Sequence, residues 1–199
     1  MNKKDQTIDT YNKSASSLAD RFNKFGVRIN DVKEGFSYIS KKNPFVLEIG
    51  CANGRDAKEI LKYTNNYLGI DISEELIKIA KQNISKGKFK VADVEDYIFP
   101  KNIDMIFSFA SLIHSNRNNL QKILNEAHES LNVGGIFYIS MKYGEYQEST
   151  KEDEFGIRTY YFYTSEDIRK IIGSSYEIIR ENVYDLRGQD LISIILRKK

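Results

Sequence analysis

The segment that most constrains the fold is an apolar run ending in a turn bounded by two glycines, from Phe45 to Asp56. Mostly apolar residues lead to Gly50, three small or polar residues separate it from Gly54, and helical spacing begins at Ala57. This order predicts a buried strand, a tight turn and a helix start. Because glycine lacks a Cβ and tolerates positive φ, such a turn lets the backbone approach a ligand, and the helix start offers free N–H groups. A plain connection between strand and helix is the alternative.

A second apolar run, Tyr67–Asp71, ends in an acid 21 positions after Gly50. An acid at the end of the second strand of a βαβ unit is placed to accept hydrogen bonds from ribose hydroxyls. Turn and acid together predict a nucleoside-bearing ligand. The turn departs from the dinucleotide fingerprint G-x-G-x-x-G, and Glu48 at the strand end disfavours a pyrophosphate. A cationic ligand without phosphate, such as S-adenosylmethionine, suits an acid better; a nicotinamide-dependent oxidoreductase is the alternative.

Five segments together resemble the class I S-adenosylmethionine-dependent methyltransferases, in particular the small bacterial type. They follow one another in the family's order from Val46 to Lys142: Val46–Gly54, Gly69–Ser73, Ala92–Val94, Ile103–Ser108 and Leu131–Gly135. The family usually has glycine where this chain has Ala52, and the extra methyl group narrows the approach to the amino-acid end of the cofactor.

The resemblance implies a Rossmann-like α/β fold, with a seven-stranded, mostly parallel sheet, an antiparallel last strand and helices on both faces. Residues 45–199 are expected to form the methyltransferase core and residues 1–44 a helical cap over the cofactor site, within one single domain overall. The implied cofactor is S-adenosylmethionine, with S-adenosylhomocysteine as product. The expected reaction is O- or N-methylation of a small-molecule acceptor.

The resemblance also implies a set of cofactor-binding residues. Asp71 would hold the ribose, Asp93 the adenine amino group, and Val94 would contact the adenine; for Asp93, a helix cap is the alternative. Tyr11 would fold over the cofactor, or else serve as a packing aromatic. The full set is Tyr11, Glu48, Gly50, Cys51, Ala52, Asn53, Gly54, Asp56, Asp71, Ile72, Asp93, Val94, Phe109 and Ala110.

The residues that would bind or deprotonate the methyl acceptor come after the fourth and fifth predicted strands. Methyl transfer needs a base only when the acceptor is a hydroxyl or a protonated amine, and His114 is the candidate because histidine titrates near neutral pH. Lys142 and Arg158 would bind a carboxylate or phosphate of the acceptor, with Tyr160 beside them. The alternatives are a packing role for His114 and solvated surface charge for the two cations.

The remaining pattern predicts the other elements of the fold. Helical spacing covers residues 5–24, 28–40 and 116–131, and Ser73 and either Thr164 or Ser165 are expected to cap helices. Residues 142–155 are polar and acidic without a clear period, which predicts a mobile loop. Residues 176–184 and 191–196 are expected to form an antiparallel pair that closes the sheet.

Composition excludes several classes of protein. A formal net charge of +2 gives no electrostatic case for nucleic acid or an anionic membrane as partner. The single cysteine, Cys51, excludes an internal disulfide and a cysteine-cluster zinc site, and its expected role is packing. We expect no metal, no signal peptide, no membrane span, a cytoplasmic location and a monomer or homodimer. A non-catalytic protein that binds S-adenosylmethionine as a partner subunit remains the second hypothesis.

Overall fold

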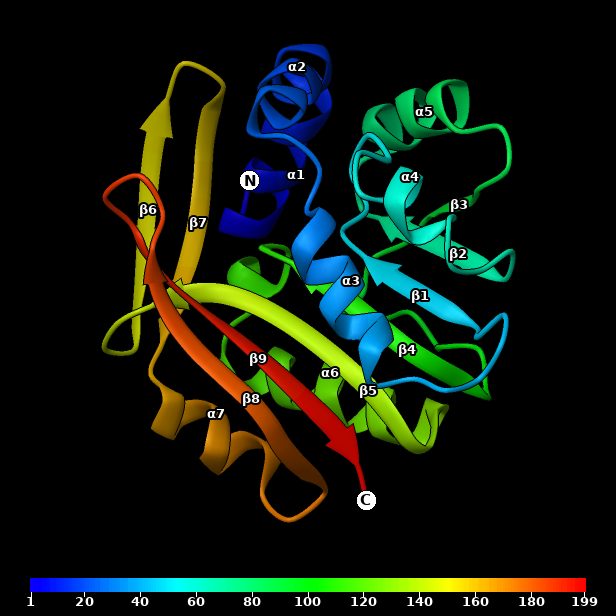
Figure 1. Ribbon diagram of the computed structural model, residues 1–199. Coiled ribbons are helices and arrows are strands. Elements are labelled where there is room, and N and C mark those ends of the chain that lie inside the picture. The colour runs from blue at the N-terminus through cyan, green and yellow to red at the C-terminus, as the bar shows by residue number, and fades with distance from the viewer.

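A twisted nine-stranded sheet runs through the computed structural model, which describes residues 1–199 (Figure 1). Strands β3, β2, β1, β4 and β5 lie side by side in that order and are parallel, and β9 pairs antiparallel with β5 and with β8. The strands are β1 (Val46–Ile49), β2 (Tyr67–Asp71), β3 (Lys88–Val91), β4 (Ile103–Phe109), β5 (Leu131–Tyr143), β6 (Gln147–Asp153), β7 (Gly156–Tyr163), β8 (Tyr176–Asp185) and β9 (Asp190–Lys198).

Helices cover both faces of this sheet, as predicted. The helices are α1 (Lys3–Lys13), α2 (Ala15–Phe25), α3 (Ile29–Ser37), α4 (Ala57–Ile60), α5 (Glu74–Asn83), the short 3₁₀ helix η1 (Leu112–His114), α6 (Arg117–Ser130) and α7 (Ser165–Ile172). Apolar residues of α3, α4 and α5 form one core with one sheet face, and those of α6 and α7 form a second core with the other. None of the helices is both long and apolar enough to cross a bilayer.

Strand β1 explains why the site lies where it does. All four of its residues are buried because it pairs in parallel with β2 on one side and β4 on the other. Leu47 and Ile49 face the α6 core and Val46 faces the α3 core, so Glu48 points to the α3 side. The chain leaves β1 at the carboxyl edge of the parallel strands, where α/β sheets bind ligands.

The structure corrects three predicted elements. The helix predicted over residues 5–24 is broken at Ser14, whose hydroxyl donates to the carbonyl of Phe155 at 2.7 Å, so two helices form. The helix predicted over residues 28–40 shortens to α3, which packs on the sheet and not over the cavity. The predicted mobile loop 142–155 is wrong: β5 extends to Tyr143 and β6 follows. Nearly all of β6 is exposed, so no apolar alternation marked it as a strand.

Strands β6 and β7 form an antiparallel hairpin that brings the strand count to nine, against the seven predicted. Figure 1 shows this hairpin standing beyond the end of β5, next to α1 and α2. The predicted helix caps at Ser73 and Thr164 are confirmed, because their side chains accept from the amides of Leu76 and Asp167. The closing pair β8–β9 is confirmed as well.

Candidate active site

A cavity of about 450 Å³ opens at the carboxyl ends of β1, β2, β3 and β4 and extends to α1, α2 and β7. Of the residues predicted to bind cofactor or acceptor, Gly54 alone does not line it. A Cβ on Gly54 would meet Ile84 Cγ1 of the segment after α5 at 3.1 Å, so this glycine lets the turn pack against α5. The other seventeen positions are brought together: Tyr11, Glu48, Gly50, Cys51, Ala52, Asn53, Asp56, Asp71, Ile72, Asp93, Val94, Phe109, Ala110, His114, Lys142, Arg158 and Tyr160.

The turn after β1 depends on residues with positive φ. Gly50 has φ of +71°, and a Cβ there would lie 2.1 Å from Ser111 Oγ, so no other residue fits. Ala52 has φ of +47°, a region in which a side chain is strained, and this is the position where the family usually has glycine. The turn is held by Asp71, whose Oδ2 accepts from the amide of Ala52 and whose Oδ1 accepts from that of Ser73, both at 2.9 Å.

Acidic groups gather on this side of the cavity. Burial raises the pKa of Asp71, while the amides that donate to it act in the opposite direction. Burial also raises the pKa of Glu48, with the charge of Asp56 adding to the effect, and Tyr67 donates its hydroxyl to the Glu48 carboxyl at 2.5 Å. Asp93 differs, because Lys4 of α1 lies 2.5 Å away and the amide of Glu95 donates to Asp93. The carboxyl therefore caps the turn after β3 and joins α1 to the end of that strand, and no helix follows it before β4.

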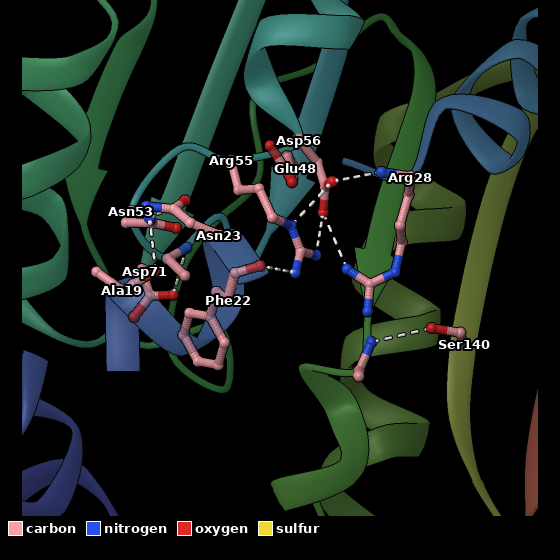
Figure 2. Close-up of polar contacts among 12 residues, drawn as sticks. Ala19, Phe22, Asn23, Arg28, Glu48, Asn53, Arg55, Asp56, Asp71 and Ser140 are labelled. Carbon is pink, nitrogen blue, oxygen red and sulfur yellow. Dashed lines mark hydrogen bonds and ion pairs between the residues drawn. The ribbon is translucent and has the colours of Figure 1, made fainter. Parts of the chain in front are cut away.

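Sequence reasoning missed two arginines that surround Asp56. Figure 2 shows the Asp56 carboxyl between the guanidinium groups of Arg28 and Arg55, at 2.9 Å and 2.6 Å. Both arginines line the cavity with Asp56, and the guanidinium carbon of Arg28 lies 5.2 Å from the centre of the Phe109 ring. Arg28 stands at the start of the predicted helix 28–40 and directly precedes α3, and helical spacing does not indicate that its side chain reaches Asp56.

Asn53 lines the cavity and carries an acceptor that no protein group uses. Its amide nitrogen donates to Asn23 Oδ1 at 3.0 Å, which fixes the side chain in the orientation seen in Figure 2. Its Oδ1 is buried without a hydrogen-bond partner. A buried acceptor of this kind is unfavourable unless a ligand donates to it. Cys51, by contrast, is buried and its thiol pKa is raised by burial, which fits packing.

Both ring nitrogens of His114, the candidate base, form hydrogen bonds with other protein groups. Nδ1 lies 2.6 Å from the carbonyl oxygen of Thr159, which can only accept, so Nδ1 carries the proton. Nε2 then accepts from the hydroxyl of Tyr11 at 2.9 Å. Burial, together with the positive charges of Arg158 and Lys142, lowers the pKa of His114 to about 4. His114 is therefore neutral at physiological pH.

Helix α1 is held in place by hydroxyl groups that bond to the free edge of β7. Thr7 Oγ accepts from the amide of Thr159, Thr10 donates to the carbonyl of Ile157, and Ser14 donates to that of Phe155, at 2.7–3.1 Å. The spacing 7, 10, 14 keeps one helix face toward every second strand residue. We call these three contacts the hydroxyl ladder. The hydroxyl ladder directs Tyr11, which lies on the same helix face, into the cavity. Its residues are polar but follow helical spacing, so a search for apolar periodicity does not detect them.

Comparison with known proteins agrees with this arrangement. Residues 46–135 match the family described as methyltransferase domain. A malonyl-[acyl-carrier protein] O-methyltransferase from Ilyobacter polytropus is 30% identical over 135 residues, which cover 65% of this chain and 46% of that protein. The chain spans less than half the length of the curated relatives it matches.

Two solved structures share the fold. An S-adenosylmethionine-dependent methyltransferase from Clostridium acetobutylicum has a TM-score of 0.74 at 14% identity, over 94% of this chain and 98% of that one. The 1,6-didemethyltoxoflavin-N1-methyltransferase of Burkholderia thailandensis, solved with S-adenosylhomocysteine, has a TM-score of 0.72 at 15% identity, over 96% of this chain and 88% of that one. The matched domain, the strand order and the turn motif together support a class I S-adenosylmethionine-dependent methyltransferase.

Proposed function

We propose that this protein transfers a methyl group from S-adenosylmethionine to an oxygen or nitrogen of a small-molecule acceptor. The observation that supports the proposal is the cavity in which the glycine turn meets the acids at the ends of β1 and β2. The residues fit a cofactor with a cationic amino-acid end. The unpartnered Asn53 Oδ1 and the buried carboxyl of Glu48 are acceptors that such an end would satisfy.

When bound, the cofactor supplies an activated methyl group for in-line displacement. The chain contributes binding, alignment and exclusion of water. In this proposal each oxygen of Asp71 keeps a lone pair for a ribose hydroxyl, since one amide occupies each. Tyr11 is held between the cofactor side and β7 and closes the cavity over the reacting centre.

The proposed catalytic role of His114 operates through Tyr11. Because Tyr11 occupies Nε2, a proton leaving the acceptor reaches His114 when the Tyr11 oxygen takes it and passes its own proton to Nε2. The pKa of His114, about 4, makes this relay weak. It suits acceptors that lose a proton easily, and an acceptor with a free lone pair needs no relay.

Two measurements test the proposal. Calorimetry should show binding of S-adenosylhomocysteine and S-adenosylmethionine, and no comparable heat with NAD. Formation of S-adenosylhomocysteine should then be followed over a panel of small hydroxyl and amine acceptors. Tight cofactor binding without turnover on any acceptor would favour the non-catalytic partner, and binding of NAD alone would favour the oxidoreductase.

A further inference from the structure

Opposite the acidic side of the cavity lies a group of cations around one tyrosine ring. Lys142 Nζ lies 5.0 Å and the Arg158 guanidinium carbon 5.8 Å from the centre of the Tyr160 ring. The His114 ring centre lies 5.0 Å from the same point. All four residues line the cavity. We call them the basic subsite.

Lys142 has no anionic partner in this subsite. Its Nζ donates to Gln189 Oε1 at 2.8 Å, which is an uncharged acceptor in the turn between β8 and β9. Its side chain also lies 5.4 Å from the centre of the Phe162 ring. Burial, together with the positive charges of Lys151 and Arg158, lowers the pKa of Lys142 to about 8. A half-buried ammonium without a counter-ion is unfavourable, because it loses hydration and gains no opposite charge.

Arg158 is more deeply buried and only partly satisfied. It is 8% exposed, it pairs with Asp153, and its Nε is buried without a hydrogen-bond partner. In the β6–β7 register it lies directly opposite Lys151, and two like charges facing each other across a hairpin destabilise it. The unsatisfied Nε and the facing like charge indicate that the arrangement is completed by a ligand.

The charges favour a ligand with one negative charge. Asp153 balances the charge of Arg158, so this pair adds no net charge to the subsite. Lys142 therefore leaves one unmatched positive charge at the cavity wall. A carboxylate would match this charge and offer oxygens to both side chains, whereas a phosphate dianion would exceed it.

We infer that the methyl acceptor carries a carboxylate, which Lys142 and Arg158 bind beside the ring of Tyr160. This inference rests on the proposed function and names its substrate class. It places the acceptor's anion on the β5–β7 side, across the cavity from the acids that face the cofactor. The reactive oxygen or nitrogen then lies toward Tyr11, since Tyr11 contacts His114, the neutral member of the basic subsite.

Benzoate and benzamide form a matched pair of probes, equal in shape and different in charge. Both should be titrated into the protein with and without saturating S-adenosylhomocysteine. We expect benzoate to bind about tenfold or more tightly than benzamide, because charge-assisted hydrogen bonds replace neutral ones. Lys142→Gln should abolish this preference. Lys122→Gln removes the same charge from the exposed side of α6, outside the cavity, and should retain it.

Several outcomes would overturn the inference. Equal binding of benzoate and benzamide, or a preference that survives Lys142→Gln, would show that the basic subsite does not select a carboxylate. Tighter binding of phenyl phosphate than of benzoate would assign it to phosphate. Competition between benzoate and S-adenosylhomocysteine would assign it to the cofactor. Failure of S-adenosylhomocysteine to bind would refute the proposed function, whereas the benzoate preference would still support the subsite.

Discussion

The two sides of the cavity are built by different means. The cofactor side consists of the ends of β1, β2 and β3, which continue directly from strands buried in the core. The acceptor side consists of η1, which is anchored in the core by Leu112, and of α1 and the β6–β7 hairpin, which are joined mainly by the hydroxyl ladder and by an ion pair between Lys3 and Glu148. Carboxyl groups gather on the first side and cations on the second. The comparison suggests a rigid binding face opposite a face that can open locally.

This difference has an energetic basis. Displacing a strand end would disrupt buried apolar contacts, which are worth several kcal/mol for each large side chain. Each contact of the hydroxyl ladder contributes about 1 kcal/mol, since folding exchanges it for a hydrogen bond to water. The acceptor side should therefore open at lower free energy than the cofactor side. Five changes test this contrast, beginning with the largest effect.

Gly50→Ala should disrupt the cofactor side most severely. The new Cβ would lie 2.1 Å from Ser111 Oγ and would also occupy a positive-φ position. We expect a loss of about 2–4 kcal/mol in unfolding free energy and no measurable S-adenosylhomocysteine binding. Thermal or urea unfolding and calorimetry measure these.

Two further variants separate crowding from strain at Gly50. Gly188→Ala, at φ of +78° with no atom within 4 Å of the new Cβ, should lose only about 1 kcal/mol. Adding Ser111→Gly to Gly50→Ala should recover the crowding part. A Gly50→Ala variant no less stable than Gly188→Ala would contradict the close packing of this turn.

Acid should destabilise the acceptor side through His114. Its pKa is about 4 in the folded protein and near 6.5 when unfolded, so the folded state favours the neutral ring. The contribution is complete above pH 6.5 and is lost as the pH falls toward 4, by about 3 kcal/mol in all. Urea unfolding between pH 4 and 7 should show this slope.

His114→Gln should flatten the acid limb, and His128→Gln on α6 is the matched control. Tyr11, Tyr160, Arg158 and Lys142 are the titratable groups that face the ring, and they keep their charge states between pH 4 and 7. An unchanged slope in His114→Gln would show that His114 is accessible to water in solution. The same shift predicts that the pH–rate profile lacks a histidine step near pH 6.5.

How far the sequence predicts each side follows from the same contrast. Strand ends are fixed by apolar runs, so Asp71 and the turn at Gly50 could be placed from periodicity and glycine alone. Arg28 could not, because it approaches from a loop before α3, and β6 could not, because an exposed edge strand needs no apolar face. The candidates Lys142 and Arg158 were found as charged residues in a suggestive segment. Their convergence on Tyr160 depends on a hairpin register that the sequence does not reveal.

Asp71→Ala should weaken S-adenosylhomocysteine binding about tenfold or more. It removes the charged acceptor proposed for the ribose and releases the amides of Ala52 and Ser73. Calorimetry measures the change, with Asp96→Ala, an exposed acid outside the cavity, as control. Benzoate binding should be unaffected, because the change lies on the opposite side. Unchanged cofactor affinity would remove Asp71 from the site.

Thr10→Val should loosen the acceptor side alone. It deletes the hydroxyl that donates to the Ile157 carbonyl at 2.7 Å and should lower the free energy of local opening by about 1 kcal/mol. Hydrogen exchange should quicken at the amide of Thr159, which donates to Thr7, while amides of β1 keep their protection. Equal acceleration in β1 would show that the two sides open together and would break the comparison.

Ala52→Gly should give the smallest effect and the only gain. Glycine relieves the strain of φ at +47°, about 1–2 kcal/mol, but it also gives the unfolded chain more freedom to lose, by about 0.4–1 kcal/mol. The net expectation is a stabilisation of about 0.5 kcal/mol, measured by thermal unfolding. Ala127→Gly in α6, with ordinary helical φ, should instead lose about 1 kcal/mol. If Ala52→Gly instead loses as much stability as Ala127→Gly, the positive φ at Ala52 is not a source of strain. The rigidity assigned to the cofactor side would then come from the strands alone.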